Sequence, residues 1–223
     1  MEVRTRLQVL VTGGGSPVAR AVARTFAAAG HEVTLAGSFA ELPQGGGTID
    51  EPGVRLLQVD PTLPEAIERA CTVADGNPLL DVLVTVPERS FPGGVEALDA
   101  ATIDLATAHL LRAPMLYTRA ALPLLRRSAT PAVVHVAPVE AFLFGTDALQ
   151  SALLNALINY TRQCVPQLPG IRLNAACPGG QSTPEQVAAL VEFLASARAG
   201  YVNSAVVTVD GGWYATHPRV MPQ

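Results

Sequence analysis

Seven short apolar runs recur along the chain, and segments with helical spacing of apolar residues separate most of them. The runs are Gln8–Thr12, Glu32–Ala36, Val54–Val59, Leu80–Val86, Ala132–Ala137, Ile171–Ala176 and Ala205–Val209. Short and largely uninterrupted apolar runs are typical of strands that are buried on both faces. Because strands that alternate with helices form parallel sheets, the sequence predicts one domain over residues 1–223. Its expected fold is α/β, with a doubly wound sheet of about seven mainly parallel strands and helices on both faces.

The turn after the first run indicates how the fold begins. Gly13–Gly15 follows the strand directly, and Ser16 and Pro17 come next. Serine is favoured as a helix N-cap and proline at the first helical position, so a helix is predicted from Pro17 until Gly30 ends it. A strand, a glycine turn, a helix and a second strand make one βαβ unit, which is the opening of a Rossmann-type fold.

Further helices are expected between the remaining strands. They are predicted over Pro64–Ala74, over one or two segments within Glu96–Arg127, over Asp147–Gln163, and over Pro184–Ala195 with Thr183 as N-cap. Pro114 and Pro123 are expected to bend or end their helices, because proline lacks an N–H and crowds the preceding turn. Ser38–Gly53 is rich in glycine and proline and is predicted to be mostly loop, and residues 214–223 are predicted to be a tail.

Composition and charge exclude several classes of function. The chain of 223 residues has a net charge of −4 and no basic stripe, which argues against nucleic-acid binding. No run of about 18 apolar residues and no signal peptide is found, so a cytoplasmic protein without membrane association is expected. Cys71, Cys164 and Cys177 are odd in number and lack metal-ligand spacing, which favours reduced thiols and no metal site.

Several segments resemble the short-chain dehydrogenase/reductase (SDR) family. Ile171–Gly179 (IRLNAACPG) is close to the family's sixth-strand segment, Val209–Gly212 matches its terminal VDGG, and Thr118–Pro123 resembles its central helix. Pro184–Ala188 and Phe193–Ser196 are similar to its seventh helix. The resemblance extends over nearly the whole chain, and it implies the SDR fold, NAD(P)-dependent oxidoreductase chemistry and assembly into dimers or tetramers.

The resemblance also places the residues of the family's proton-transfer machinery. In SDR enzymes a tyrosine, acidified by a lysine, exchanges a proton with the substrate, a serine orients the reacting oxygen, and an asparagine helps to hold a relay water. Pro138 stands at the serine position, Ser151 at the tyrosine, Asn155 at the lysine and Leu110 at the asparagine. A serine hydroxyl is far less acidic than a phenol, and an amide has no charge with which to lower a neighbouring pKa. The 15 cationic residues of the chain are all arginine, so no lysine elsewhere in the sequence can take the role of the missing one.

The segment that corresponds to the family's cofactor turn, Thr12–Ala19, departs from the TGxxxGxG pattern. Gly13, Gly15 and Ser16 are the turn residues left to contact a cofactor. Pro17 replaces the glycine that lets the backbone approach the pyrophosphate, and it brings a ring while removing an N–H. The resemblance therefore implies a degenerate cofactor turn.

Other cofactor positions are changed as well. Gly37 and Ser38 stand where NAD enzymes carry an acid for the ribose and NADP enzymes often carry arginine. Thr85–Glu88 replaces the family's NNAG turn, whereas Asp60 matches its adenine-site aspartate. No cofactor is expected, and a weak NAD(P) site at Asp60 and the remaining turn residues is the alternative.

The segment after Gly179 is much shorter than in the family, where it folds over the substrate. Here Gly180–Thr183 leads directly to Pro184 and the next helix, so the substrate lid is predicted to be missing. An open crevice would hold water, which weakens active-site electrostatics.

Three functions are compatible with these residues. The first is a non-catalytic SDR-like subunit that associates with itself or with an active SDR paralogue through the apolar helix Leu149–Gln163. The second is a repurposed biosynthetic enzyme, a cyclase, dehydratase or isomerase, that uses His109, His135 or Asp147 for acid–base chemistry. The third is an atypical NAD(P)-dependent oxidoreductase.

Overall fold

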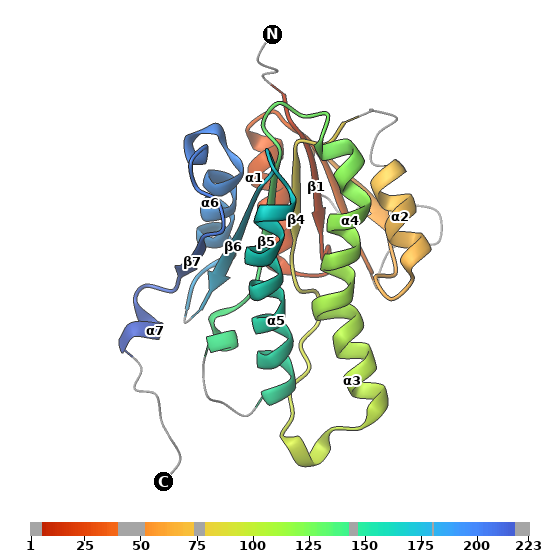
Figure 1. The fold of residues 1–223 in the computed structure, drawn as a ribbon, viewed down its shortest axis with the longest axis vertical. Helices are drawn as coiled ribbons and strands as arrows, with labels where there is room; N and C mark the ends of the chain where they lie inside the picture. Colours follow the sequence, from red (N-terminus) through yellow and green to blue (C-terminus); the bar gives the residue numbers. More distant parts are fainter. Residues whose placement is uncertain (1–5, 40–51, 74–78, 143–146, 180, 217–223) are drawn as a thin grey trace.

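A seven-stranded parallel sheet forms the centre of the computed structural model, which describes residues 6–39, 52–73, 79–142, 147–179 and 181–216 (Figure 1). The strand order is β3-β2-β1-β4-β5-β6-β7, and all six pairings are parallel. The strands are β1 (Gln8–Thr12), β2 (Glu32–Gly37), β3 (Val54–Gln58), β4 (Val82–Thr85), β5 (Ala132–Val136), β6 (Arg172–Pro178) and β7 (Val206–Val209). The predicted fold class is confirmed, and each predicted strand lies within two residues of the observed one at either end.

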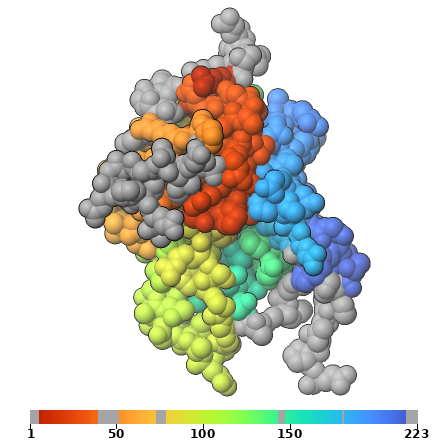
Figure 2. Space-filling model, turned by 180° about the vertical axis from the view of Figure 1, so that it is seen from behind, coloured from red at the N-terminus to blue at the C-terminus, as the bar shows by residue number. Residues whose placement is uncertain are grey.

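Helices cover both faces of the sheet. They are α1 (Pro17–Ala28), α2 (Pro64–Val73), α3 (Ala100–Thr107), the π-helical η2 (Ala108–Arg112), α4 (Ala113–Leu125), α5 (Ala148–Cys164), α6 (Pro184–Ala195) and the short α7 (Trp213–Thr216). Short 3₁₀ turns are η1 (Val95–Ala97), η3 (Val139–Phe142), η4 (Val165–Gln167) and η5 (Ala197–Ala199). The helices α1 and α6 lie side by side on the face turned to the viewer in Figure 2, and α2, α4 and α5 lie on the opposite face (Figure 1).

Alternating residues of the buried strands supply the two halves of the core. In β1, Val9 and Val11 pack with α1 and α6, whereas Leu10 packs with α2 and α4 on the other face. This period of two follows from the strand geometry, in which successive side chains point to opposite faces. The apolar runs read from the sequence are continuous because both faces of this sheet are covered.

The point at which the strand order reverses lies between β1 and β4. Strands β2 and β3 extend the sheet on one side of this pair, and β4 to β7 extend it on the other. In open α/β sheets the crevice for a ligand forms at such a point, outside the carboxyl ends of the strands. The candidate site is therefore expected next to the loops that leave β1 and β4.

Two details near helix ends differ from the simplest prediction. Pro123 was predicted to bend or end its helix, and it does not end it, because α4 continues to Leu125. The Arg119 carbonyl, one turn earlier, loses its partner within the helix because proline has no N–H. The predicted tail begins instead with the helix α7, where the Asp210 carboxylate accepts the N–H groups of Gly212 and Tyr214.

The predicted helix starts have different outcomes. Thr183 caps α6 as expected, in a capping box with Gln186. Ser16 occupies the N-cap of α1, but its side chain makes no capping hydrogen bond. Pro114 lies at the start of α4, directly after the π-helical η2. The loop predicted over residues 38–53 falls mostly outside the described residues.

One arginine fixes the end of α6 to the sheet. Arg172, at the start of β6, donates to the carbonyls of four residues at and just after the end of that helix: Leu194 (2.6 Å), Ala195 (3.0 Å), Ser196 (3.2 Å) and Ala199 (3.1 Å). The last carbonyls of a helix have no partner within the helix, and a cation is favourable at that end. The guanidinium thus satisfies acceptors that would otherwise be left unpaired at a partly buried position.

We expect Arg172→Met to lower the free energy of unfolding by roughly 2–3 kcal/mol, since charge-assisted hydrogen bonds are lost and only partly replaced by water. Urea denaturation followed by circular dichroism measures this change. Arg198→Met is the control, because Arg198 is exposed and its guanidinium only lies 5.6 Å from the centre of the Phe193 ring. Equal losses in the two variants would contradict the assigned role of Arg172.

Candidate functional site

The glycine turn after β1 packs closely against the loop after β4. Gly13 has a φ of +85°, in the left-handed region that favours glycine. A Cβ atom at Gly13 would lie 2.2 Å from the carbonyl oxygen of Val86. Position 13 therefore requires glycine for its conformation and for this backbone contact, which joins the carboxyl ends of β1 and β4.

The next two glycines also face groups of the protein itself. A Cβ at Gly14 would lie 2.3 Å from the ring of Phe39, and a Cβ at Gly15 would lie 2.9 Å from the Glu88 carboxylate. In a dinucleotide-binding Rossmann fold, the glycines of this turn leave room for the pyrophosphate. Here side chains of the chain occupy the space in front of the turn.

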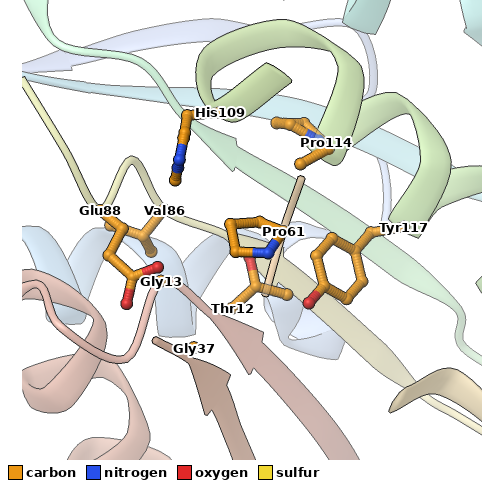
Figure 3. Close-up of a pocket in the computed structure, with 10 residues that line it drawn as sticks. Thr12, Gly13, Gly37, Pro61, Val86, Glu88, His109, Pro114 and Tyr117 are labelled. Atoms are coloured by element: carbon orange, nitrogen blue, oxygen red, sulfur yellow. The ribbon is translucent and has the colours of Figure 1, made fainter. Parts of the chain in front are cut away.

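The Glu88 carboxylate bonds to the glycine turn and to the residue after β2, and Figure 3 shows its side chain beside Gly13. Its Oε1 accepts the backbone N–H of Gly15 at 2.8 Å and that of Ser38 at 2.9 Å. Its Oε2 accepts the Ser38 hydroxyl at 3.1 Å. Burial raises the pKa of Glu88, and the hydrogen bonds from Gly15 and Ser38 oppose that shift. The sequence indicated only that Glu88 ends the segment replacing the NNAG turn.

The end of β2 leaves no room for a ribose-binding acid. A Cβ at Gly37 would lie 2.4 Å from the backbone nitrogen of Gly14 and 2.7 Å from Glu88 Oε1. The cavity bordered by Gly37, Pro61, His109 and Tyr117 encloses about 20 Å³, which is room for about one water molecule.

The loop after β4, which we call the crossing loop (residues 86–93), is held at both ends. Glu88 binds the glycine turn and the end of β2, as described above. At the other end, the Gln150 side-chain oxygen accepts the N–H of Phe91 at 2.9 Å and the Ser90 hydroxyl at 3.1 Å. Asp147 accepts the N–H of Gly93 at 3.0 Å. The crossing loop thus connects α1 and β2 to the start of α5 across the crevice.

A larger hollow of about 500 Å³ lies beside the crossing loop. Its apolar side is formed by Pro17, Leu110, Pro138 and Leu154. Arg89, Glu140, Asp147 and Gln150 are among its polar lining residues. Its volume is in the range of small-molecule sites. It is lined by Pro138 and Leu110, which the sequence resemblance predicts to stand at two of the family's four proton-transfer positions.

Ser151 and Asn155, which the resemblance predicts to stand at the other two positions, lie one helical turn apart on α5, and both side chains make hydrogen bonds. Ser151 Oγ donates to the Glu140 carbonyl at 2.6 Å, and the Asn155 side-chain amide donates to the Ala141 carbonyl. Both acceptors belong to η3, the turn that follows Pro138. These two side chains hold η3 against α5. Leu110, in the π-helical η2, is 2% exposed and packs with Phe91.

The three candidate substitutes for catalysis are not brought together. His109 borders the small cavity, and Asp147 lines the larger hollow. His109 is half-buried with its ring 5.9 Å from that of Phe91, and burial together with Arg89 lowers its pKa. Asp147 is already an acceptor for the crossing loop. A His–Asp pair made from these residues is therefore not the arrangement observed.

His135 belongs to the core. It is 0% exposed, and its Nδ1 lies 2.7 Å from Thr85 Oγ1. Thr118 directs its hydroxyl proton to the Pro114 carbonyl, so its oxygen is left to accept from His135 Nε2–H at 3.5 Å. Nδ1 is then the unprotonated nitrogen and accepts from Thr85. Burial lowers the pKa of His135 to about 4, which favours a neutral, structural histidine over a catalytic substitute.

Asp60 follows β3 and forms a local turn. Its Oδ1 accepts the N–H of Thr62 at 2.8 Å and the Thr62 hydroxyl at 2.7 Å, and these bonds lower the pKa of Asp60. Its role in binding adenine stays a prediction. Among the described residues, no group of three or more His, Cys, Asp or Glu side chains could hold a metal ion. Within the same residues, none of the helices has the length and apolar character needed to span a membrane.

Comparison with known proteins assigns the family. The sequence pattern of the short chain dehydrogenase family matches residues 8–190. Levodione reductase of Leifsonia aquatica is 26% identical over 262 aligned residues, which cover 94% of this chain and 94% of the relative. The 2-(S)-hydroxypropyl-CoM dehydrogenase 3 of Xanthobacter autotrophicus is 28% identical over 245 residues, covering 93% and 96%. A solved short chain dehydrogenase/reductase family protein superposes with a TM-score of 0.83 at 26% identity, covering 96% of this chain and all of that one.

The chain therefore belongs to the short chain dehydrogenase family, as the resemblance of its motifs predicted. Members of this family typically bind NAD(P), and the relatives above are named as a reductase and a dehydrogenase.

We expect the stability of the protein to depend on pH through His135. The pKa is about 4 in the folded chain and about 6.5 for an unperturbed histidine, so the unfolded state binds more protons between these values. Stability from this group is complete above pH 6.5 and is lost as the pH falls toward 4, by up to roughly 3 kcal/mol.

Urea denaturation over this pH range, compared between the wild type and His135→Asn, isolates the contribution. The carboxyl groups titrate in both proteins, so only the difference in slope reports His135. Parallel pH profiles would show that His135 is not a buried neutral histidine.

Proposed function

We propose that the chain is an SDR-fold subunit that does not transfer hydride and that associates with itself or with an active SDR paralogue. The observation that carries this proposal is the use of Ser151 and Asn155, which donate to the η3 carbonyls instead of facing a substrate oxygen. The absence of lysine from the whole sequence supports the same conclusion.

The chemistry of the four positions explains why hydride transfer would fail. Reduction of a carbonyl needs a proton donor beside the oxygen that receives negative charge. Pro138 has no donor, and Leu110 is apolar. The hydroxyl of Ser151 is weakly acidic, and Asn155 has no charge that could make it more acidic. None of these four side chains can therefore give a proton to a substrate oxygen in the way that the family's tyrosine does.

Weak or absent binding of NAD(P) is the second part of the proposal. The turn amide of Gly15 is bound to Glu88, and Pro17 removes a donor from the start of α1. The Cβ contacts at Gly37 leave no room for a ribose-binding acid. These features do not fit a dinucleotide held as in other Rossmann folds.

Association through the α5 segment, residues 149–163, is the third part. Leu154, Leu157, Ile158 and Thr161 are buried. Ala152 and Asn159 are exposed on the same helix. The exposed side of α5 around Ala152 has short, uncharged residues and can approach another helix closely, so this part of α5, before the exposed Arg162, is where we place the contact with a second subunit.

Two competing functions have their own support. Family membership and the names of the relatives favour an NAD(P)-dependent oxidoreductase. The hollow of about 500 Å³ with Asp147 on its wall favours a repurposed enzyme without redox chemistry. If the chain is a repurposed enzyme, Asp147→Asn should reduce the amount of pathway product that the cell forms. If the chain is a non-catalytic subunit, the amount of that product should not change.

We expect the purified protein to oxidise neither NADH nor NADPH when it is offered a panel of aldehydes, ketones and diketones. Loss of NAD(P)H absorbance is the measurement, with levodione reductase assayed in parallel as the active comparator. Steady turnover that requires both cofactor and carbonyl would refute the proposed function and identify the chain as an oxidoreductase.

We also expect Ala152→Arg to weaken self-association, because a long charged side chain would be buried at the proposed contact. Light scattering after size-exclusion chromatography gives the molar mass of the assembly. Ala28→Arg, at the exposed end of α1 on the other face of the sheet, is the matched control. Self-association through α5 is wrong if the wild type is monomeric or if both variants keep its mass.

A further inference from the structure

Three donors from two distant parts of the chain converge on one carboxylate. The N–H of Gly15 lies 73 residues from Glu88 in sequence, and the N–H and hydroxyl of Ser38 lie 50 residues away. Gly15 belongs to the glycine turn before α1, and Ser38 follows β2. Backbone amides at such a turn form an anion site because they carry partial positive charge and have no partner within the helix.

In a Rossmann fold this place receives the phosphates of a nucleotide. We propose that the Glu88 carboxylate is a built-in substitute for such a phosphate, and that its removal would open a binding site for nucleoside diphosphates. The proposal deepens the expected weakness of NAD(P) binding, because it assigns the blocking of the turn amides to one side chain, Glu88. It does not depend on the predicted proton-transfer positions, which lie after β5, in η2 and on α5.

The crossing loop holds the Glu88 carboxylate in place at the amides of Gly15 and Ser38. Gln150 and Asp147 hold the loop at Phe91 and Gly93, so Glu88 is positioned from both directions. A phosphate that approached the turn would have to break three hydrogen bonds of the carboxylate. It would also meet a like charge at short distance in a partly buried setting, where repulsion is stronger than in water.

The space around Glu88 agrees with this reading. Glu88 Oε1 would be 2.9 Å from a Cβ at Gly15 and 2.7 Å from one at Gly37, so the side chain fills the gap between the turn and the end of β2. The adjoining cavity of about 20 Å³ also borders Glu88. Truncation at position 88 would join this cavity to the space in front of the Gly15 and Ser38 amides.

Pro17 does not explain why a phosphate would be excluded from the amides of Gly15 and Ser38. Its ring is exposed, and the donor it lacks is a different one from the Gly15 amide. The Ser16 N–H is already bound to the Gly13 carbonyl at 2.8 Å. The amides of Gly15 and Ser38 would therefore be free to bind an anion once Glu88 is removed, with Pro17 still in place.

Isothermal titration with ADP tests the proposal, because ADP carries the adenosine and the diphosphate but no nicotinamide. We expect Glu88→Ala to bind ADP about tenfold more tightly than the wild type, or better, as the loss of a charged competitor for these donors implies. Glu96→Ala in η1 is the matched control: it removes the same charge from an exposed position and should leave ADP affinity unchanged. Adenosine, which has no phosphate, should gain nothing from Glu88→Ala.

The proposal is overturned if the wild type binds ADP as tightly as a folded Glu88→Ala variant, or if adenosine gains as much as ADP. If Glu88→Ala does not fold, Glu88→Gln decides the matter. It keeps the shape and an acceptor oxygen but loses the charge, and it should still gain about threefold for ADP; no gain would overturn the proposal. Carbonyl turnover by the wild type would refute the proposed function without bearing on this affinity difference.

Discussion

The contact between Gly13 and the Val86 carbonyl is the constraint on which the crevice depends. It brings the loops after β1 and β4 together at the point where the strand order reverses. The crossing loop begins at this contact, so Glu88, two residues later, is delivered to the front of the glycine turn. A single loop, the crossing loop, then joins the glycine turn before α1, the end of β2 and the start of α5.

Several polar side chains at the crevice form hydrogen bonds with backbone groups of the chain itself. Ser151 and Asn155 hold η3, Asp147 and Gln150 hold the crossing loop, and Glu88 holds the turn and Ser38. Each of these bonds satisfies a backbone group that would otherwise need water or a ligand. The family scaffold is preserved, while the side chains that line its crevice serve to fix loops.

The sheet and most helices could be predicted from the sequence. Strands of a sheet that is covered on both faces consist of continuous apolar runs, whereas apolar residues of a helix recur every three or four positions. The sequence could not predict the contact of Glu88 with Gly15, since the two residues are separated by 73 positions and meet only through the loop geometry. The sequence predicted that His135 lies within a strand. It could not predict its hydrogen-bond partners, because Thr85 and Thr118 lie on other elements. Proline lacks an N–H and crowds the preceding turn, yet α4 continues through Pro123 to Leu125, so the sequence alone did not decide between a bend and an end.

The packing around Gly37 has a consequence for how this lineage could change. An acid at that position, the simplest route to a ribose contact, would place its Cβ 2.4 Å from the Gly14 backbone nitrogen and 2.7 Å from Glu88. The second obstacle is a side chain that one substitution removes, but the first is backbone, which yields only if the turn itself shifts. An acid at position 37 therefore needs both a change at position 88 and a shift of the glycine turn, so no single substitution at position 37 supplies a ribose contact without strain.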